Sequence, residues 1–319
     1  MRLGGSGKLN RVKMKEIIIS LLFLISTLNC CCQTSEEYFK QGCANGKLQD
    51  LPGALASFNK CISLDSSHSE VFIERGNVKY LLLDYLGAIN DYDKALELDM
   101  NKSEGSSVFF QRGMSKFKLK DYNACIQDFS FALMLDPNDA IAYYNRGCAK
   151  KFLYNYTEAI DDFSKAIEIN PADEFAYLER GNAKAQLHDY IGAVADYSKV
   201  LNLNNKNKQA MLARGAAKFY LLDYRGTIED CNKAIGVNSS DANAYKYRGY
   251  AKTKLGDNKG ALDDLNRALT LSPNDPANLY TRGQVKIILG QKESGCLDLS
   301  KAGELGYGDA YRLIKEYCQ

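Results

Sequence analysis

The sequence repeats itself every 34 residues, and this period restricts the fold more than any other feature of the chain. Seven Arg-Gly dipeptides fall in one register, with one interval of 37 residues followed by five of 34. The arginines are Arg75, Arg112, Arg146, Arg180, Arg214, Arg248 and Arg282. Another glycine, Gly42, lies 34 residues before Gly76, so eight glycines mark eight units. Such a period is typical of arrays in which each unit packs against its neighbours.

We number the units repeat one to repeat eight and give each place by its distance from the repeat glycine. The repeats span 35–68, 69–102, 106–139, 140–173, 174–207, 208–241, 242–275 and 276–309, with an insertion at 103–105. Small residues recur at +12 and +19, a bulky apolar residue at +16 in most repeats, and a turn residue at +24 in six repeats. Small residues let helix backbones approach closely, and the bulky residue fills the space beside them. Each repeat is therefore predicted to form two stacked helices of about 12–15 residues.

These columns resemble the tetratricopeptide repeat, and the resemblance covers residues 35–309. Five signature places of repeat four match: Gly147, Ala159, Phe163, Ala166 and Pro171. The resemblance implies an all-α fold, an α-solenoid whose eight helix-turn-helix units form a right-handed superhelix. It also implies a concave groove lined by the first helix of each repeat. Residues 310–319 have apolar residues at helical spacing and are expected to form a capping helix.

Three charged columns vary together and predict a ladder of ion pairs. Arg precedes the glycine, Lys stands at +3 and Asp at +15 in seven repeats, whereas repeat one has Gln41, Asn45 and Ser57. The central members of the predicted ladder are Arg112, Asp128, Arg146, Asp162, Arg180, Asp196, Arg214, Asp230, Arg248 and Asp264. The alternative is that the arginine column binds a ligand.

The groove is the expected binding site, and its columns follow from the resemblance. The candidate residues are Asn77, Tyr80, Phe110, Phe117, Tyr144, Phe152, Asn182, Phe219, Lys246 and Tyr250. Aromatic side chains would anchor a peptide, and Asn side chains would hold its backbone. The alternative is that these rings pack between helices. The clamp of two Lys, two Asn and Arg that holds Hsp70 and Hsp90 tails in this family is not supplied by three adjacent repeats, so such tails are not expected partners.

The N-terminal segment predicts export. Residues 1–13 are basic and would lie outside the protein if Met14 is the true start. Residues 14–30 have a basic start and an apolar run at 17–28 that is too short to span a bilayer, as in a signal peptide. Leu28 stands three places before Cys31, which resembles the lipobox of bacterial lipoproteins; Cys30 is the alternative acceptor. We expect a lipid anchor at the bacterial outer membrane with 31–34 as a tether, or else a periplasmic or secreted protein.

The sequence favours binding over catalysis. The net charge of +2 does not indicate a nucleic-acid partner. His68 and His188 share no register, and no phosphate loop or nucleophile motif occurs. We therefore expect no enzyme, cofactor or metal. The predicted function is a scaffold for a peptide or protein partner; self-assembly and an accessory subunit of a separate enzyme are alternatives. A bridge between Cys296 and Cys318 could hold the cap in an oxidising compartment.

Overall fold

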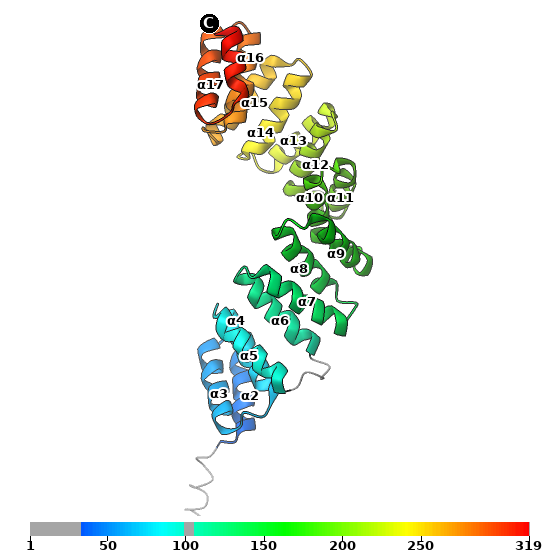
Figure 1. Cartoon of the computed structure of the whole chain (residues 1–319), viewed down its shortest axis with the longest axis vertical. Helices are drawn as coiled ribbons and strands as arrows, with labels where there is room; N and C mark the ends of the chain where they lie inside the picture. Colours follow the sequence, from blue (N-terminus) through cyan, green and yellow to red (C-terminus); the bar gives the residue numbers. More distant parts are fainter. Residues whose placement is uncertain (1–32, 99–104, 319) are drawn as a thin grey trace, which may run out of the picture. The chain divides into compact units, whose positions relative to one another are not determined.

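The computed structural model describes residues 33–98 and 105–318, and these residues are all-helical. They contain 17 helices in paired units and no strand, which confirms the expected fold class. The paired helices are α2 (Ser35–Lys47), α3 (Leu51–Leu64), α4 (Ser69–Leu81), α5 (Tyr85–Leu98), α6 (Gly105–Lys118), α7 (Tyr122–Leu135), α8 (Ala140–Phe152), α9 (Tyr156–Ile169), α10 (Glu174–Gln186), α11 (Tyr190–Leu203), α12 (Lys208–Tyr220), α13 (Tyr224–Val237), α14 (Ala242–Lys254), α15 (Asn258–Leu271), α16 (Pro276–Ile288) and α17 (Lys292–Glu304), followed by α18 (Asp309–Tyr317) (Figure 1).

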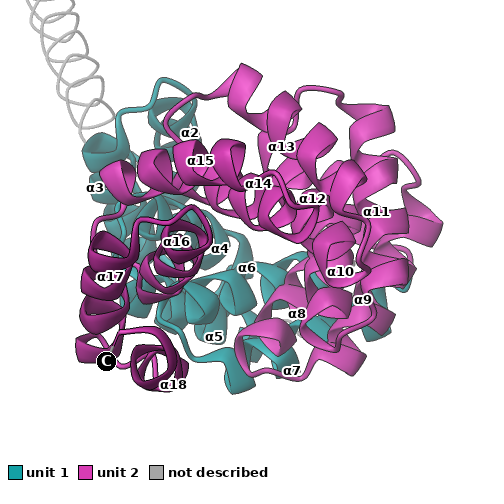
Figure 2. Cartoon of the chain, turned by 90° about the horizontal axis from the view of Figure 1, so that it is seen from above, with its two compact units in different colours: residues 1–137 teal, residues 138–319 magenta. Residues whose placement is uncertain are grey.

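The chain divides into two compact bodies after Pro137 (Figure 2). The N-terminal body contains α2–α7, and the C-terminal body contains α8–α18. The right-handed superhelix expected from the resemblance stays a prediction. The predicted signal peptide at 14–30 and both candidate acceptors, Cys30 and Cys31, lie outside the described residues.

The helices of each body stack in sequence order. We call the first helix of a repeat its A helix and the second its B helix. Each A helix packs against the B helix of its own repeat, and each B helix packs against the next A helix of the same body. Successive A helices also touch, as α10, α12 and α14 do. The A helices therefore form a continuous layer within each body, and the side chains along it form what we call the A-helix face.

A short reverse turn joins the two helices of each repeat. In repeat five, His188 takes a left-handed backbone conformation with φ of 61°. Asp189 then caps α11 by accepting a hydrogen bond of 2.9 Å from the amide of Gly192. The corresponding places in repeats seven and eight hold Gly256 and Gly290, for which a left-handed φ is not strained.

The repeat glycines allow the A and B helices to approach closely. A Cβ atom placed on Gly147 would lie 2.8 Å from Cε1 of Phe163, well inside van der Waals contact. Ala159 and Ala166 are fully buried beside the same ring. The columns at +12, +16 and +19 are thus the core of each helix pair, as close packing requires.

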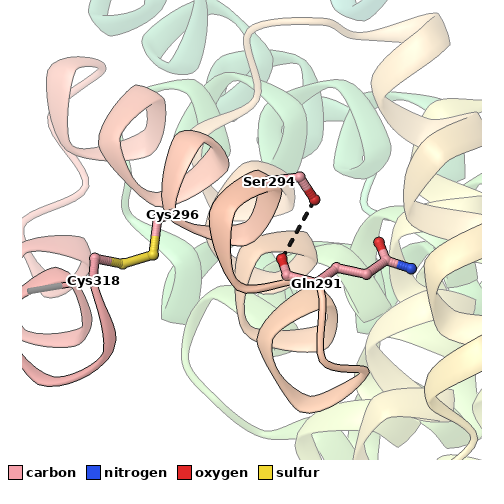
Figure 3. The surroundings of a disulfide bond; sticks show 4 residues. All are labelled: Gln291, Ser294, Cys296 and Cys318. Carbon is pink, nitrogen blue, oxygen red and sulfur yellow. Dashed lines mark hydrogen bonds between the residues drawn. A yellow bond between two sulfur atoms is a disulfide. The ribbon is translucent and has the colours of Figure 1, made fainter.

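The array ends in a helix that is tied to the last repeat. Helix α18 packs against α17, and Ala310 is buried there. Cys318 forms a disulfide with Cys296 of α17, with 5.8 Å between the two Cα atoms (Figure 3). None of the helices within 33–98 and 105–318 is long and apolar enough to cross a membrane.

Candidate functional site

The three charged columns meet in every repeat that carries them. In repeat six, Arg214 donates to both carboxylate oxygens of Asp230 at 2.9 and 2.7 Å, and Lys218 lies 2.9 Å from the same carboxylate. Asp230 is only 1% exposed. Burial acts to raise the pKa of Asp230, but the hydrogen bonds from Arg214 and Lys218 outweigh it and hold the pKa below its ordinary value. Within the described residues, seven carboxylates are held in this way: Asp91, Asp128, Asp162, Asp196, Asp230, Asp264 and Asp298.

The arginine has a further contact that links one repeat to the one before it. The remaining guanidinium nitrogen of Arg214 donates to the Ser198 hydroxyl at 3.0 Å, and that of Arg75 donates to the Asn59 amide oxygen at 2.8 Å. The acceptors occupy the +17 column of the preceding repeat. Sequence reasoning missed this contact, although the polar residues at +17 could have indicated it. Because Arg214 has its nitrogens engaged inside the fold, this arrangement favours a structural role for the column over ligand binding.

Two of the asparagines assigned to the groove hold the helix pair together. Asn77 accepts a hydrogen bond of 2.9 Å from the Tyr92 hydroxyl, and Asn182 accepts one of 2.9 Å from Tyr197. Burial raises the pKa of both tyrosines well above the ordinary range. Repeats two and five are the repeats with Asn at +1, and they are also those with Tyr at +16. The pairing of these columns was therefore visible in the sequence.

Several aromatic candidates also pack against their own repeat. Ring centroids lie 5.6 Å apart for Phe110 and Phe129, and 5.9 Å apart for Tyr144 and Phe163. The other such pairs are Tyr80 with Tyr85 and Phe117 with Tyr122. These distances are typical of interior aromatic contacts. The four candidates Tyr80, Phe110, Phe117 and Tyr144 thus contribute to the A–B helix interface.

The remaining candidates lie in the C-terminal body, and several link neighbouring repeats. Tyr250 donates to Asn278 at 2.9 Å, and Lys246 lies 3.2 Å from Asp275. Phe219 contacts Tyr220, Tyr224, Tyr247 and Tyr250 in one cluster of rings. Phe152 remains about half exposed, at 49%. The structure therefore brings Phe219 and Tyr250 together.

Models of the tetratricopeptide repeat family match residues 106–139 and 140–173. These ranges are repeats three and four, whose helix pairs recur in the other repeats and whose charged columns recur in all of them except repeat one. The chain is a tetratricopeptide repeat protein. No curated protein matches the sequence.

Solved structures of tetratricopeptide repeat proteins have the same fold. One from Parabacteroides merdae is 22% identical with a TM-score of 0.57, covering 79% of this chain and 99% of that one. The C-terminal part of another from Cytophaga hutchinsonii is 21% identical with a TM-score of 0.65, covering 76% and 98%. YrrB is 21% identical with a TM-score of 0.51, covering 59% and 97%. At these identities the likeness shows the fold alone.

The A-helix face of this tetratricopeptide repeat protein has a small polar cleft in the C-terminal body. The cleft of about 350 Å³ is lined by Lys151, Tyr156, Asn182, Ala185, Gln186 and Tyr197. Lys151 also lies 2.6 Å from Glu179, which links α8 to α10. Cys148 follows the repeat glycine on α8, and burial raises the pKa of its thiol to about 12, so the thiol stays protonated.

A flat aromatic surface lies farther along the same body. The rings of Tyr190 and Tyr220 stack with centroids 4.8 Å apart and planes 11° apart. Tyr220 remains 54% exposed. Stacked rings that keep an open face are suited to extended or proline-containing peptides, which bind along aromatic surfaces. No group of His, Cys, Asp and Glu within the described ranges could hold a metal ion.

Proposed function

We propose that this tetratricopeptide repeat protein is a non-catalytic scaffold that binds a peptide or protein partner on its A-helix face. The proposal rests on a contrast between columns. The Arg, Lys and Asp columns are the same in seven repeats because every repeat has the same packing problem. The +1 column on the A-helix face differs along the C-terminal body: Cys148, Asn182, Ala216, Tyr250 and Gln284. Two of these residues, Asn182 and Tyr250, also make hydrogen bonds within the array. A varied surface on a constant frame suits the recognition of one particular partner.

Two exposed aromatic residues are the anchors that we propose for this partner. Phe152 and Tyr220 lie on A helices, and each leaves about half of its side chain open to solvent. Tyr is enriched among the residues that dominate binding energy at protein interfaces, and Phe is enriched in the buried centre of such interfaces. Among proteins of the same fold, YrrB is described as having an unusual peptide-binding site, and Cut9 was crystallised in a complex with Hcn1.

We further propose that the protein works at the bacterial cell envelope. The Cys296–Cys318 disulfide supports this location because disulfides persist in oxidising compartments and are rare in the cytosol. The predicted signal peptide and the lipobox at Cys31 agree with it. Intact-mass analysis of the protein expressed in a bacterium tests the anchor. Acylation that is lost in the Cys31→Ser variant supports the proposal, and an unprocessed, unmodified chain contradicts it.

The binding proposal is tested by capture from envelope extracts followed by mass spectrometry. Partners retained by the wild-type protein should be lost from the Phe152→Ala and Tyr220→Ala variants. The matched control is Leu297→Ala on α17, which removes an exposed apolar side chain from a B helix. If all three variants retain the same partners, the A-helix face is not the binding surface. Light scattering of the purified protein separates partner binding from self-assembly.

A further inference from the structure

A second, larger cleft lies in the N-terminal body on the side of the B helices. Its volume is about 800 Å³, within the range of ligand-binding sites in proteins. Helices α5 and α7 each pack against α6, and the cleft lies between them. It is lined by Asp93, Leu96, Glu97, Phe109, Arg112, Phe131, Met134 and Leu135. We call it the B-helix cleft.

The apolar wall of this cleft departs from the pattern of the other repeats. The +18 place is Lys or Arg in seven repeats: Lys60, Lys94, Lys165, Lys199, Lys233, Arg267 and Lys301. In α5 and α9 this Lys pairs with a Glu at +21, at 3.0 and 2.7 Å. Repeat three has Phe131 and Met134 instead, and they are 49% and 75% exposed. The fold therefore does not require apolar residues at these two places.

The charge of the cleft also departs from the repeat pattern, at the junction between repeats two and three. The +17 place is Asn or Ser in seven repeats but Asp93 in repeat two. Asp93 accepts a hydrogen bond of 2.5 Å from Arg112, as Asn59 does from Arg75 in the preceding junction. Asp93 adds one negative charge to this junction, whereas Phe131 and Met134 replace the Lys–Glu pair of α5 and α9 without a change in net charge. The added carboxylate favours a basic partner.

Phe131 packs against a second ring of the cleft and keeps about half of its side chain exposed. Its ring stacks on Phe109 with centroids 5.2 Å apart and planes 27° apart. Asp93 and Glu97 stand on α5, whereas Phe131, Met134 and Leu135 stand on α7. The α5 wall thus carries two partly exposed carboxylates, Asp93 paired with Arg112 and Glu97 with Lys94, and the α7 wall is apolar. A helix with an apolar stripe and flanking Lys or Arg residues matches both walls.

We propose that the B-helix cleft binds a basic amphipathic helix of a partner protein. This site is separate from the A-helix face, so the inference does not depend on the function proposed above. The apolar stripe of the partner helix lies against Phe131 and Met134, and a Lys or Arg of the helix faces Asp93 and Glu97.

Two synthetic peptides of about 16 residues, long enough to form a helix, test the proposal. Both carry Leu at i, i+3, i+4 and i+7; one has Lys and the other Glu at the polar places. Fluorescence anisotropy with the full chain measures their affinities. We expect the Lys peptide to bind at least about tenfold more tightly than the Glu peptide.

The chain itself supplies the matched variants. The double variant Phe131→Lys, Met134→Glu restores the Lys–Glu pattern of α5 and α9 without changing the net charge. It should keep the thermal stability of the wild type and weaken binding of the Lys peptide about tenfold. Asp93→Asn keeps an acceptor for Arg112 and should reduce the preference for the Lys peptide. The control Lys165→Ala, Glu168→Ala changes the same places of α9 and should leave binding unchanged.

Three results would overturn the proposal. The first is equal affinity of the wild type and the double variant for the Lys peptide. The second is a wild-type dimer in light scattering that the double variant abolishes, which assigns the cleft to a second copy of the chain. The third is binding to vesicles of anionic lipid that the double variant loses while peptide binding persists, which assigns the cleft to a membrane surface.

Discussion

Removing the carboxylate of Asp230 tests whether the ion-pair ladder stabilises the array. Asp230 accepts hydrogen bonds from Arg214 at 2.9 and 2.7 Å and lies 2.9 Å from the Lys218 ammonium. Asp230→Ser leaves both cations without their shared partner. Removing one member of a buried ion pair costs about 3–5 kcal/mol because the remaining charge is uncompensated. The side chains of Arg214 and Lys218 are 16% and 19% exposed, so water screens them and we expect the lower end, about 3 kcal/mol.

Repeat one provides the control because it has no ladder member and still folds. The triple variant Arg214→Gln, Lys218→Asn, Asp230→Ser gives repeat six the set found at Gln41, Asn45 and Ser57. Replacing a whole ion-pair network with uncharged residues is often close to neutral. We therefore expect the triple variant to lose less than about 1.5 kcal/mol, recovering at least half of the stability lost by the single variant.

Thermal unfolding followed by circular dichroism measures both variants. A loss of about 3 kcal/mol corresponds to a fall in Tm of about 6–12 °C for a cooperative unit of this size. Hydrogen exchange should locate the loss at α12 and α13, which carry the three residues. A Tm of Asp230→Ser within about 1 °C of the wild type, or a triple variant no more stable than the single one, would refute the reasoning.

The same carboxylate gives the sign of the pH dependence. Its pKa is lower in the folded protein than in the unfolded chain, so its contribution to stability is fully present above the unfolded pKa. That contribution is lost as the pH falls through the unfolded value of about 3.9 and then through the lower folded value. The wild type should therefore lose stability below about pH 4 more steeply than the triple variant does.

Five further variants test the packing, the turns and the C-terminal link of the array. Gly147→Ala should lower the free energy of unfolding in urea by about 1–3 kcal/mol, because the new Cβ would overlap an aromatic ring. Gly215→Ala should raise it by up to about 1 kcal/mol, because the nearest atom would be 3.4 Å away and alanine favours the helix. Leu222→Gly should raise Tm by relieving about 1 kcal/mol of strain at a φ of 63°, whereas Gly256→Leu, at 81°, should lower Tm. Cys318→Ser opens the link across 22 residues, removes about 3 kcal/mol, and should speed hydrogen exchange in α18 but not in α8.

The helical fold was predictable from the sequence because its determinants recur. A glycine that admits a neighbouring side chain, an aromatic ring in repeats one to five, and small residues that flank it occupy the same places in each helix pair. Eight copies of one pattern therefore define the helices more securely than any single copy. The contact between Arg214 and Ser198 was missed because it joins two repeats, and a pattern read within one repeat does not show it.

The groove residues were less predictable, and the reason is physical. A family column gives the direction in which a side chain points but not the partner that the side chain finds. Asn182 points along the A-helix face, yet its oxygen accepts the hydroxyl proton of Tyr197. Tyr144 likewise belongs to a groove column, yet its ring packs against the ring of Phe163. A large side chain at the rim of a helix pair gains more by burying part of its surface than by remaining in water, so it packs inward wherever it can.

Comparison among the repeats separates departures from the repeat pattern that the fold explains from departures that it does not explain. Where a structural column changes, its partner column changes with it, as when Tyr at +16 accompanies Asn at +1, or when all three ladder members change in repeat one. The change at Phe131 and Met134 is explained only in part in this way: Phe131 stacks on Phe109, but about half of Phe131 and most of Met134 remain exposed after folding. An exposed Lys–Glu pair contributes little to stability, so its loss costs the fold little, but the apolar surface that stays in water at Phe131 and Met134 contributes nothing to folding. A departure that the fold does not compensate implies a contact outside the chain, and the carboxylate at Asp93 indicates that this contact carries positive charge.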